Sequence, residues 1–296
     1  MMQHATAEEV AEVATTVPVG RGPGAGLPAA RGRAGLRGSM RSELTKIWSV
    51  RSTYWSLIAL AVITVGLGAL FCFAKAQHFG QLPVHVQQAQ RVGEISQATE
   101  VSLFGLILGQ LVIAVLGALT ITSEYSTGMI RTSLSVMPRR GVWLGAKAAV
   151  FAAVALVTGL VTSFVSYFLG QAILSTQHIN STLGQPGVLR AVVGGGLFLA
   201  VCGMLSFGLG VVLRNTAGAI TASIALLFVL YVLTGFLPAS WAIHVDKWVP
   251  FNAGSAIWQH ASAPVMFSPW TGFALFCGYA AVALAGGLIL FRRRDA

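Results

Sequence analysis

The stretch VSLFGLILGQLVIAVLGALTITS, residues 101–123, runs for 23 residues without an Asp, Glu, Lys or Arg. A helix needs about 20 apolar residues to cross the hydrocarbon core of a membrane. We therefore expect this segment to form one membrane-spanning helix. Comparable uncharged runs occur at five other places in the chain, namely 52–74, 148–189, 191–213, 215–245 and 248–291.

The composition agrees with a membrane protein. Charged residues make up 9% of the chain and hydrophobic residues 55%, whereas a soluble domain carries about a quarter charged residues. We predict an all-α, polytopic membrane protein with six transmembrane helices at 53–74, 101–122, 146–169, 188–213, 217–237 and 270–291. Residues 75–100 are expected to form an outer loop. Small residues let helices pack closely in lipid, so we interpret the pair Gly105 and Gly109 as a packing contact.

The first 38 residues differ from the rest. They are rich in Gly, Pro and Arg, a composition that favours disorder, so we predict a disordered tail at 1–38 and a membrane domain at 39–296. Met1 and Met40 are equally plausible first residues. Residues 40–51 place Leu44, Ile47 and Trp48 at helical spacing, which predicts an interfacial helix; the alternative is a basic flank of the first span.

The lysines and arginines predict the orientation. With the N-terminus inside, fifteen of the nineteen fall on the inner side and four on the outer side. Lys and Arg concentrate in cytoplasmic loops. Both termini are therefore expected to be cytoplasmic.

The inner segment 123–145 combines an acidic start with a basic end. Ser123 is expected to cap a short helix with Glu124 in its first turn, and Ile130, Leu134 and Met137 would share one apolar face. Pro138 would end that helix. Spacing alone leaves two interpretations open, a helix that binds a partner and a connector that binds anionic lipid.

The outer segment 238–269 is rich in aromatic residues and proline and poor in charge. We expect a re-entrant hairpin of two short helices, partly inserted in the membrane before the last span. The alternative is an aromatic belt in the membrane interface.

Several functions are disfavoured. The sequence has no HExxH, no GxSxG and no paired carboxylates, so we expect no enzyme, no catalytic residue and no metal site. The basic residues lie at helix ends rather than on one face, which argues against nucleic acid as a partner. Ion-coupled transporters need charged groups within their spans, and we find almost none. No lysine follows the glycines of an ATP-binding P-loop, so ATP would have to bind to a separate subunit.

Three motifs resemble one known family. The first is Glu124-Tyr125-Ser126-Thr127-Gly128 with Arg131, Leu134, Pro138, Arg140 and Lys147. The second is the basic opening at Arg41–Lys46 and Val50–Trp55, and the third is Trp248-Val249-Pro250-Phe251-Asn252-Ala253. In this order they resemble ABC-2 type transporter permeases, the membrane subunits of ABC transporters, over about residues 40–294. The opening is most similar to actinobacterial members.

The resemblance implies a function. Such permeases have six spans, act as dimers in the bacterial plasma membrane, and pair with a cytosolic ABC ATPase through a cytoplasmic coupling helix. We therefore expect the chain to be an ABC exporter permease that works as a homodimer or a heterodimer. It would contact membrane lipid, and its substrate would be hydrophobic or amphiphilic. The alternatives are a stand-alone secondary transporter or channel and a non-transport membrane partner. Matched by position, the implied ATPase-coupling residues are Glu124, Tyr125, Gly128, Arg131, Arg139, Arg140, Arg41, Lys46 and Arg51.

Overall fold

The computed structural model describes residues 51–129, 140–259 and 267–293, all within the compact unit Leu36–Ala296. Every regular element in these residues is a helix, which confirms the all-α prediction. The predicted tail at 1–38 and the interfacial helix at 40–51 lie outside the described residues, apart from Arg51. The apolar face of Ile130, Leu134 and Met137 also lies outside them.

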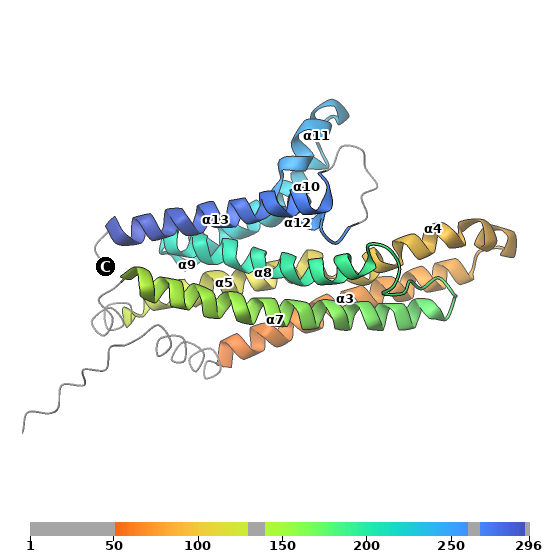
Figure 1. Ribbon diagram of the computed structural model, residues 1–296, viewed down its shortest axis with the longest axis horizontal. Helices are drawn as coiled ribbons and strands as arrows, with labels where there is room; N and C mark the ends of the chain where they lie inside the picture. Colours follow the sequence, from red (N-terminus) through yellow and green to blue (C-terminus); the bar gives the residue numbers. More distant parts are fainter. Residues whose placement is uncertain (1–50, 130–139, 260–266, 294–296) are drawn as a thin grey trace, which may run out of the picture. The chain divides into compact units, whose positions relative to one another are not determined.

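Six helical stretches are long and apolar enough to cross a membrane, as predicted. The first, third, fourth and sixth are single helices, the second consists of two helices in line, and the fifth is interrupted by a π-helical turn. The helices of these stretches are α3 Arg51–Gly80, α4 Val84–Leu103, α5 Leu106–Ser126, α7 Arg140–Ser175, α8 Val188–Leu213, α9 Thr216–Ile224, η2 Ala225–Val229, α10 Leu230–Thr234 and α13 Pro269–Arg293 (Figure 1).

Helix α8 is the centre of the bundle. It packs along α5, α7 and α13, and 67% of its apolar window is buried, the largest share among the six stretches. Its glycines at 194–196 explain this position, because a Cβ atom on each would press against a different neighbour: Ile257, Ser163 and Leu160 in turn. Without a hydrophobic force between helices in lipid, such close approach drives association.

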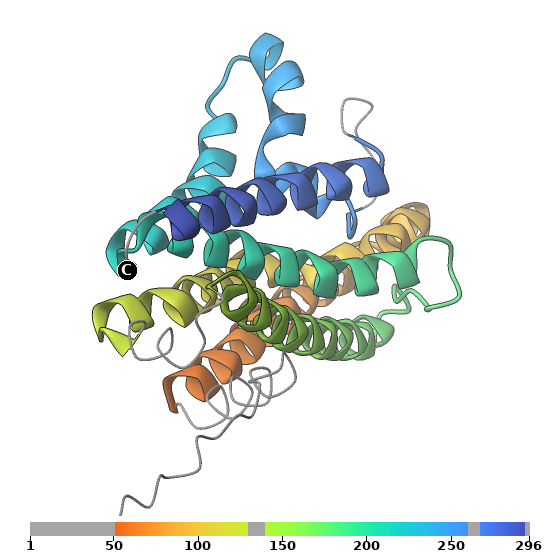
Figure 2. The same ribbon diagram turned by 60° about the vertical axis from the view of Figure 1, so that its left-hand side comes forward.

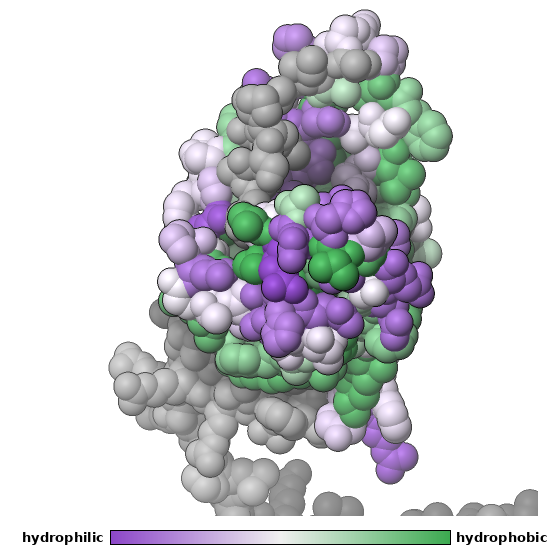
Figure 3. Space-filling model, turned by 90° about the vertical axis from the view of Figure 1, so that its right-hand side faces the viewer, coloured by the Kyte–Doolittle hydropathy of each residue, from purple (hydrophilic) through white to green (hydrophobic). Residues whose placement is uncertain are grey.

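The two ends of the bundle differ in charge. The start of α7, the end of α8 and the end of α13 bring Arg140, Arg214, Arg292 and Arg293 to one end, which we call the basic end. The turn between α3 and α4 lies at the other end, which we call the far end (Figure 1). Exposed hydrophilic residues gather on the far end (Figure 3), among them His78, Gln81, Gln88 and Arg91.

The far end is more helical than predicted. The expected outer loop at 75–100 is wrong, because α3 continues to Gly80 and α4 begins at Val84. Lys75, which ended the predicted span, pairs with Glu94 of α4 at 2.6 Å and donates to Gln97 at 3.2 Å. A second small apolar core then holds the extended helices together, formed by Cys72, Ala76, Phe79, Ala98, Leu174 and Ile179.

A buried hydrogen-bond network centred on Gln171 joins α7 to α4. The Gln171 Nε2 group donates to the carbonyl of Ala98 (3.2 Å) and to Ser102 Oγ (2.9 Å), and its Oε1 atom accepts from the backbone N–H of Ser181 (2.6 Å). One amide thus pairs with two groups of α4 and with one group of the segment that follows α7. Buried polar groups are stabilising only when they are satisfied in this way.

Replacing Gln171 with Leu is expected to lower the free energy of unfolding by about 1–3 kcal/mol, because the Ser181 N–H would stay buried without a partner. The measurement is the thermal unfolding midpoint of the solubilised protein. Gln88→Leu is the control, since Gln88 is exposed on α4. Equal midpoints for the two variants would contradict the prediction.

Two short helices occupy the segment before the last span. They are α11, Ala239–Val245, and α12, Pro250–Ser255, joined by a single 3-10 turn, η3, at Asp246–Trp248. All six residues of α12 are buried, and the Tyr279 hydroxyl of α13 donates to the carbonyl of Trp248 at 2.8 Å. Helices α10 and α11 stand off the bundle (Figure 2). The pair of short helices is as predicted, and its insertion into a membrane stays a prediction.

Candidate functional site

A buried ion pair joins α5 to α7 at the basic end. The Nζ atom of Lys147 lies 2.7 Å from Oε1 of Glu124, and the two side chains are only 6% and 7% exposed. Glu124 lies in the last turn of α5, because that helix continues to Ser126. The expected cap of a new helix at Ser123 is therefore wrong: Ser123 is part of α5, and its carbonyl accepts from the N–H of Thr127 at 3.1 Å.

Tyr125, the residue after Glu124, contacts Arg214 at the end of α8. Arg214 ends α8 in the left-handed conformation, with a φ of 55°, and its N–H donates to the carbonyl of Gly210 at 3.0 Å. Its guanidinium lies 5.3 Å from the centre of the Tyr125 ring, within the range of a cation–π interaction. Tyr125 also packs against the main apolar core.

Trp143 connects the same site to α13. This buried ring stacks on Phe291 with a centroid distance of 5.8 Å, and the Lys147 ammonium lies 5.7 Å from its centre. Gly141 leaves room for Arg292, because a Cβ atom there would lie 2.8 Å from the guanidinium. The basic ends of α5, α7, α8 and α13 are thus in contact through polar and aromatic side chains.

The chain leaves α5 through an exposed turn. The Thr127 hydroxyl donates to the carbonyl of Ser123 at 2.8 Å. Gly128 then adopts a φ of 69°, which a glycine adopts without the steric cost that a Cβ atom would bring. Met129, the last described residue before α7, is 47% exposed. The described part of the chain therefore leaves α5 through exposed residues.

The predicted coupling residues fall into three groups. Glu124 and Tyr125 lie in the site just described, and Gly128 lies in the turn that follows it. Arg51 and Arg140 begin α3 and α7; the Arg51 side chain is exposed, and that of Arg140 lies outside the described atoms. The remaining four lie outside the described residues: Arg41, Lys46, Arg131 and Arg139.

Sequence reasoning missed three residues of the site, Lys147 as a partner of Glu124, Trp143 and Arg214. A signal for the ion pair was present. Lys147 is the sole charged residue of 141–189, and Glu124 is the sole acidic residue of 101–245. An isolated acid and an isolated base in apolar surroundings are expected to pair, because a lone buried charge is costly. No comparable feature of the sequence indicates that Trp143 belongs to the site.

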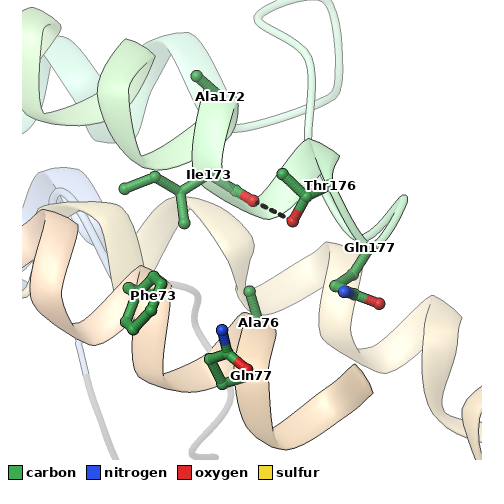
Figure 4. A pocket seen from close by; sticks show the side chains of 7 residues that line it. All are labelled: Phe73, Ala76, Gln77, Ala172, Ile173, Thr176 and Gln177. Atoms are coloured by element: carbon green, nitrogen blue, oxygen red, sulfur yellow. Dashed lines mark hydrogen bonds between the residues drawn. The ribbon is translucent and has the colours of Figure 1, made fainter. Parts of the chain in front are cut away.

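A pocket of about 430 Å³ lies between α3 and the end of α7, towards the far end (Figure 4). Its polar groups are the amides of Gln77 and Gln177 and the Thr176 hydroxyl, which donates to the carbonyl of Ile173 at 2.8 Å. The remaining lining residues are Phe73, Ala76, Ala172 and Ile173. This uncharged lining supplies no acid, base or nucleophile. Within the described ranges, no three His, Cys, Asp or Glu residues gather to hold a metal ion.

The fold and the site define a multi-pass, all-helical membrane protein with a buried ion pair and several arginines at one end of the bundle. The sequence model of the ABC-2 family transporter protein matches residues 43–296, and the chain belongs to this family. The resemblance seen in the sequence motifs is thereby confirmed. No curated protein matches the chain.

Proposed function

We propose that this chain is the membrane-spanning permease subunit of an ATP-driven exporter, and that a separate cytosolic ABC ATPase binds and hydrolyses the ATP. The observation that carries the proposal is the family match over residues 43–296, a range that includes all six helical stretches. The chain itself would contribute the translocation path and no cofactor. Two permease copies, or one copy with a paralogue, would form that path.

The basic end faces the cytoplasm in this proposal, and the membrane is the bacterial plasma membrane. The described residues at that end include Arg140, Lys147, Arg214, Arg292 and Arg293. Excess Lys and Arg next to spans favours a cytoplasmic location. The connection between α5 and α7 would then be the segment that meets the ATPase.

The predicted coupling residues divide into two roles under this proposal. Gly128, Arg131, Arg139 and Arg140 would contact the ATPase, with Arg41, Lys46 and Arg51 as a second contact. Glu124 is too buried to bind a partner directly, and Tyr125 packs on the core. These two residues would instead hold in place the end of α5, where the connection to α7 begins.

The substrate we propose is hydrophobic or amphiphilic. The spans contain mainly Leu, Val, Ala, Gly and Phe, which suits an apolar compound better than an ion. Large apolar side chains are exposed on the outside of α7 and α13, including Val157, Val161 and Val282. These faces are available to lipid or to the second permease copy.

The experiment is co-purification from the native host in mild detergent, followed by identification of the bound proteins. A P-loop ATPase is expected with the wild-type chain, and at least a tenfold lower yield of it with Arg131→Ala or Arg140→Ala. Arg293→Ala is the matched control, because it removes an exposed arginine at the same end and should leave the yield unchanged.

Two outcomes would count against the proposal. If no ATPase accompanies the wild-type chain, a stand-alone transporter becomes the better interpretation. If the ATPase is retained in both arginine variants, the chain is a permease but the contact lies elsewhere.

A further inference from the structure

The Glu124–Lys147 ion pair spans the two ends of the connection between α5 and α7. Glu124 lies two residues before the end of α5, and Lys147 lies seven residues after the start of α7. Both side chains are almost fully shielded from water. The chain thus leaves one helix and enters the next at points that a buried contact holds together.

Helices α5 and α7 have few direct contacts apart from this pair. Each packs extensively along α8 but little against the other. The ion pair is therefore a direct bridge between them. Its removal would take away a buried polar contact between the two ends of the connection.

The bridge extends to two further helices. Through Trp143, which the Lys147 ammonium approaches at 5.7 Å, it reaches Phe291 of α13. Through Tyr125, the residue after Glu124, it reaches Arg214 at the end of α8. The ion pair thus belongs to a contiguous set of packed side chains from α5, α7, α8 and α13.

Stability alone does not explain the pair. Replacing a buried ion pair with neutral side chains of similar size is often neutral or stabilising, because desolvation offsets the attraction of the charges. Glu124 also lies at the C-terminal end of α5, where the helix dipole disfavours a negative charge. We therefore explain the ion pair by its position, because it joins the end of α5 to the start of α7.

We propose that Glu124 and Lys147 are positioning residues, and that their ion pair makes the end of α5 and the start of α7 move as one body. Binding of the ATPase would then move these two spans together. The proposal rests on the proposed function and assigns a separate step: residues 128–140 bind the ATPase, and the pair converts that binding into movement of the helices.

The experiment uses the complex with its co-purified ATPase in lipid nanodiscs. The three native cysteines are replaced by Ser, and spin labels are placed at Val92→Cys on α4 and Trp241→Cys on α11, both exposed positions. The distance between the labels is measured without nucleotide and with ATP plus vanadate. The labelled parent is expected to show a nucleotide-dependent shift.

The decisive variant is Glu124→Gln with Lys147→Met, which removes the pair without leaving a lone charge. It is expected to retain the ATPase and ATP hydrolysis but to lose at least two thirds of the distance shift. The reversed pair, Glu124→Lys with Lys147→Glu, is expected to restore at least half of the shift. Ser123→Ala, an exposed change in the same turn, serves as the control and should keep the full shift.

Each contrary result has its own meaning. A neutral variant that shifts as far as the parent would overturn the positioning role while leaving the permease assignment intact. The role is also overturned if the reversed pair fails to restore the shift, or if the parent labels do not move with ATP. If no ATPase accompanies the parent, the proposed function fails and this inference fails with it.

Discussion

Lys147→Met alone is expected to lower the free energy of unfolding by about 3–5 kcal/mol, the largest effect of any single substitution considered. The change removes the ammonium group that lies 2.7 Å from the Glu124 carboxylate, and breaking a buried ion pair by removing one of its two groups costs about this much. Unfolding would be followed in nanodiscs or mild detergent by the fraction of protein that stays monodisperse as temperature or denaturant rises.

The double variant Glu124→Gln with Lys147→Met separates charge from packing. Because it leaves no unpaired charge, its stability is expected to lie within about 1 kcal/mol of the wild-type value. Arg293→Met, which removes an exposed positive charge at the same end, should have almost no effect. A double variant as unstable as Lys147→Met would show that the lost contacts of the lysine stem, and not the charge, cause the effect.

Gly105→Ala is expected to destabilise the protein by about 1–3 kcal/mol, as overpacking in a close-packed site does. A Cβ atom at Gly105 would overlap the backbone carbonyl of Thr64 in α3. Backbone cannot rotate away as a side chain can, so α3 and the junction of α4 with α5 would have to separate. The measurement is again the unfolding midpoint of the solubilised protein.

Gly66→Ala is the matched control, and its effect on the stability of the protein should have the opposite sign. Gly66 lies in α3 with no atom within 4 Å of an added Cβ, and alanine favours a helix over glycine by about 1 kcal/mol. We therefore expect a small increase in stability. If both variants behaved alike, the close approach at Gly105 would not matter for folding.

The number and place of the spans could be predicted from the sequence, because an uncharged apolar run of this length usually forms a membrane-spanning helix. The interpretation of Gly105 and Gly109 as a packing contact is confirmed, since both lie against Thr64. Helix α4 could not be found this way. Its residues are mixed in polarity, and its partners in α7 are far away in sequence.

The candidate site was predicted only in part, for a physical reason. Hydrophobic periodicity and charge counts describe single segments, whereas the site depends on which helix ends meet. Glu124 was expected in the first turn of a short surface helix, because a Ser followed by an acid often begins one. The continuation of α5 to Ser126 instead gave that carboxylate a buried place beside α7.

The central position of α8 has a consequence for synthesis. The chain emerges from the ribosome in order, so α3, α5 and α7 enter the membrane before the helix on which two of them mainly pack. Helix α3 already contacts α5 and α7, but a large part of the surface that these two helices bury is missing until α8 has been inserted. Nascent chains that end before this point are expected to be degraded rapidly, whereas those that include α8 should begin to resist proteolysis.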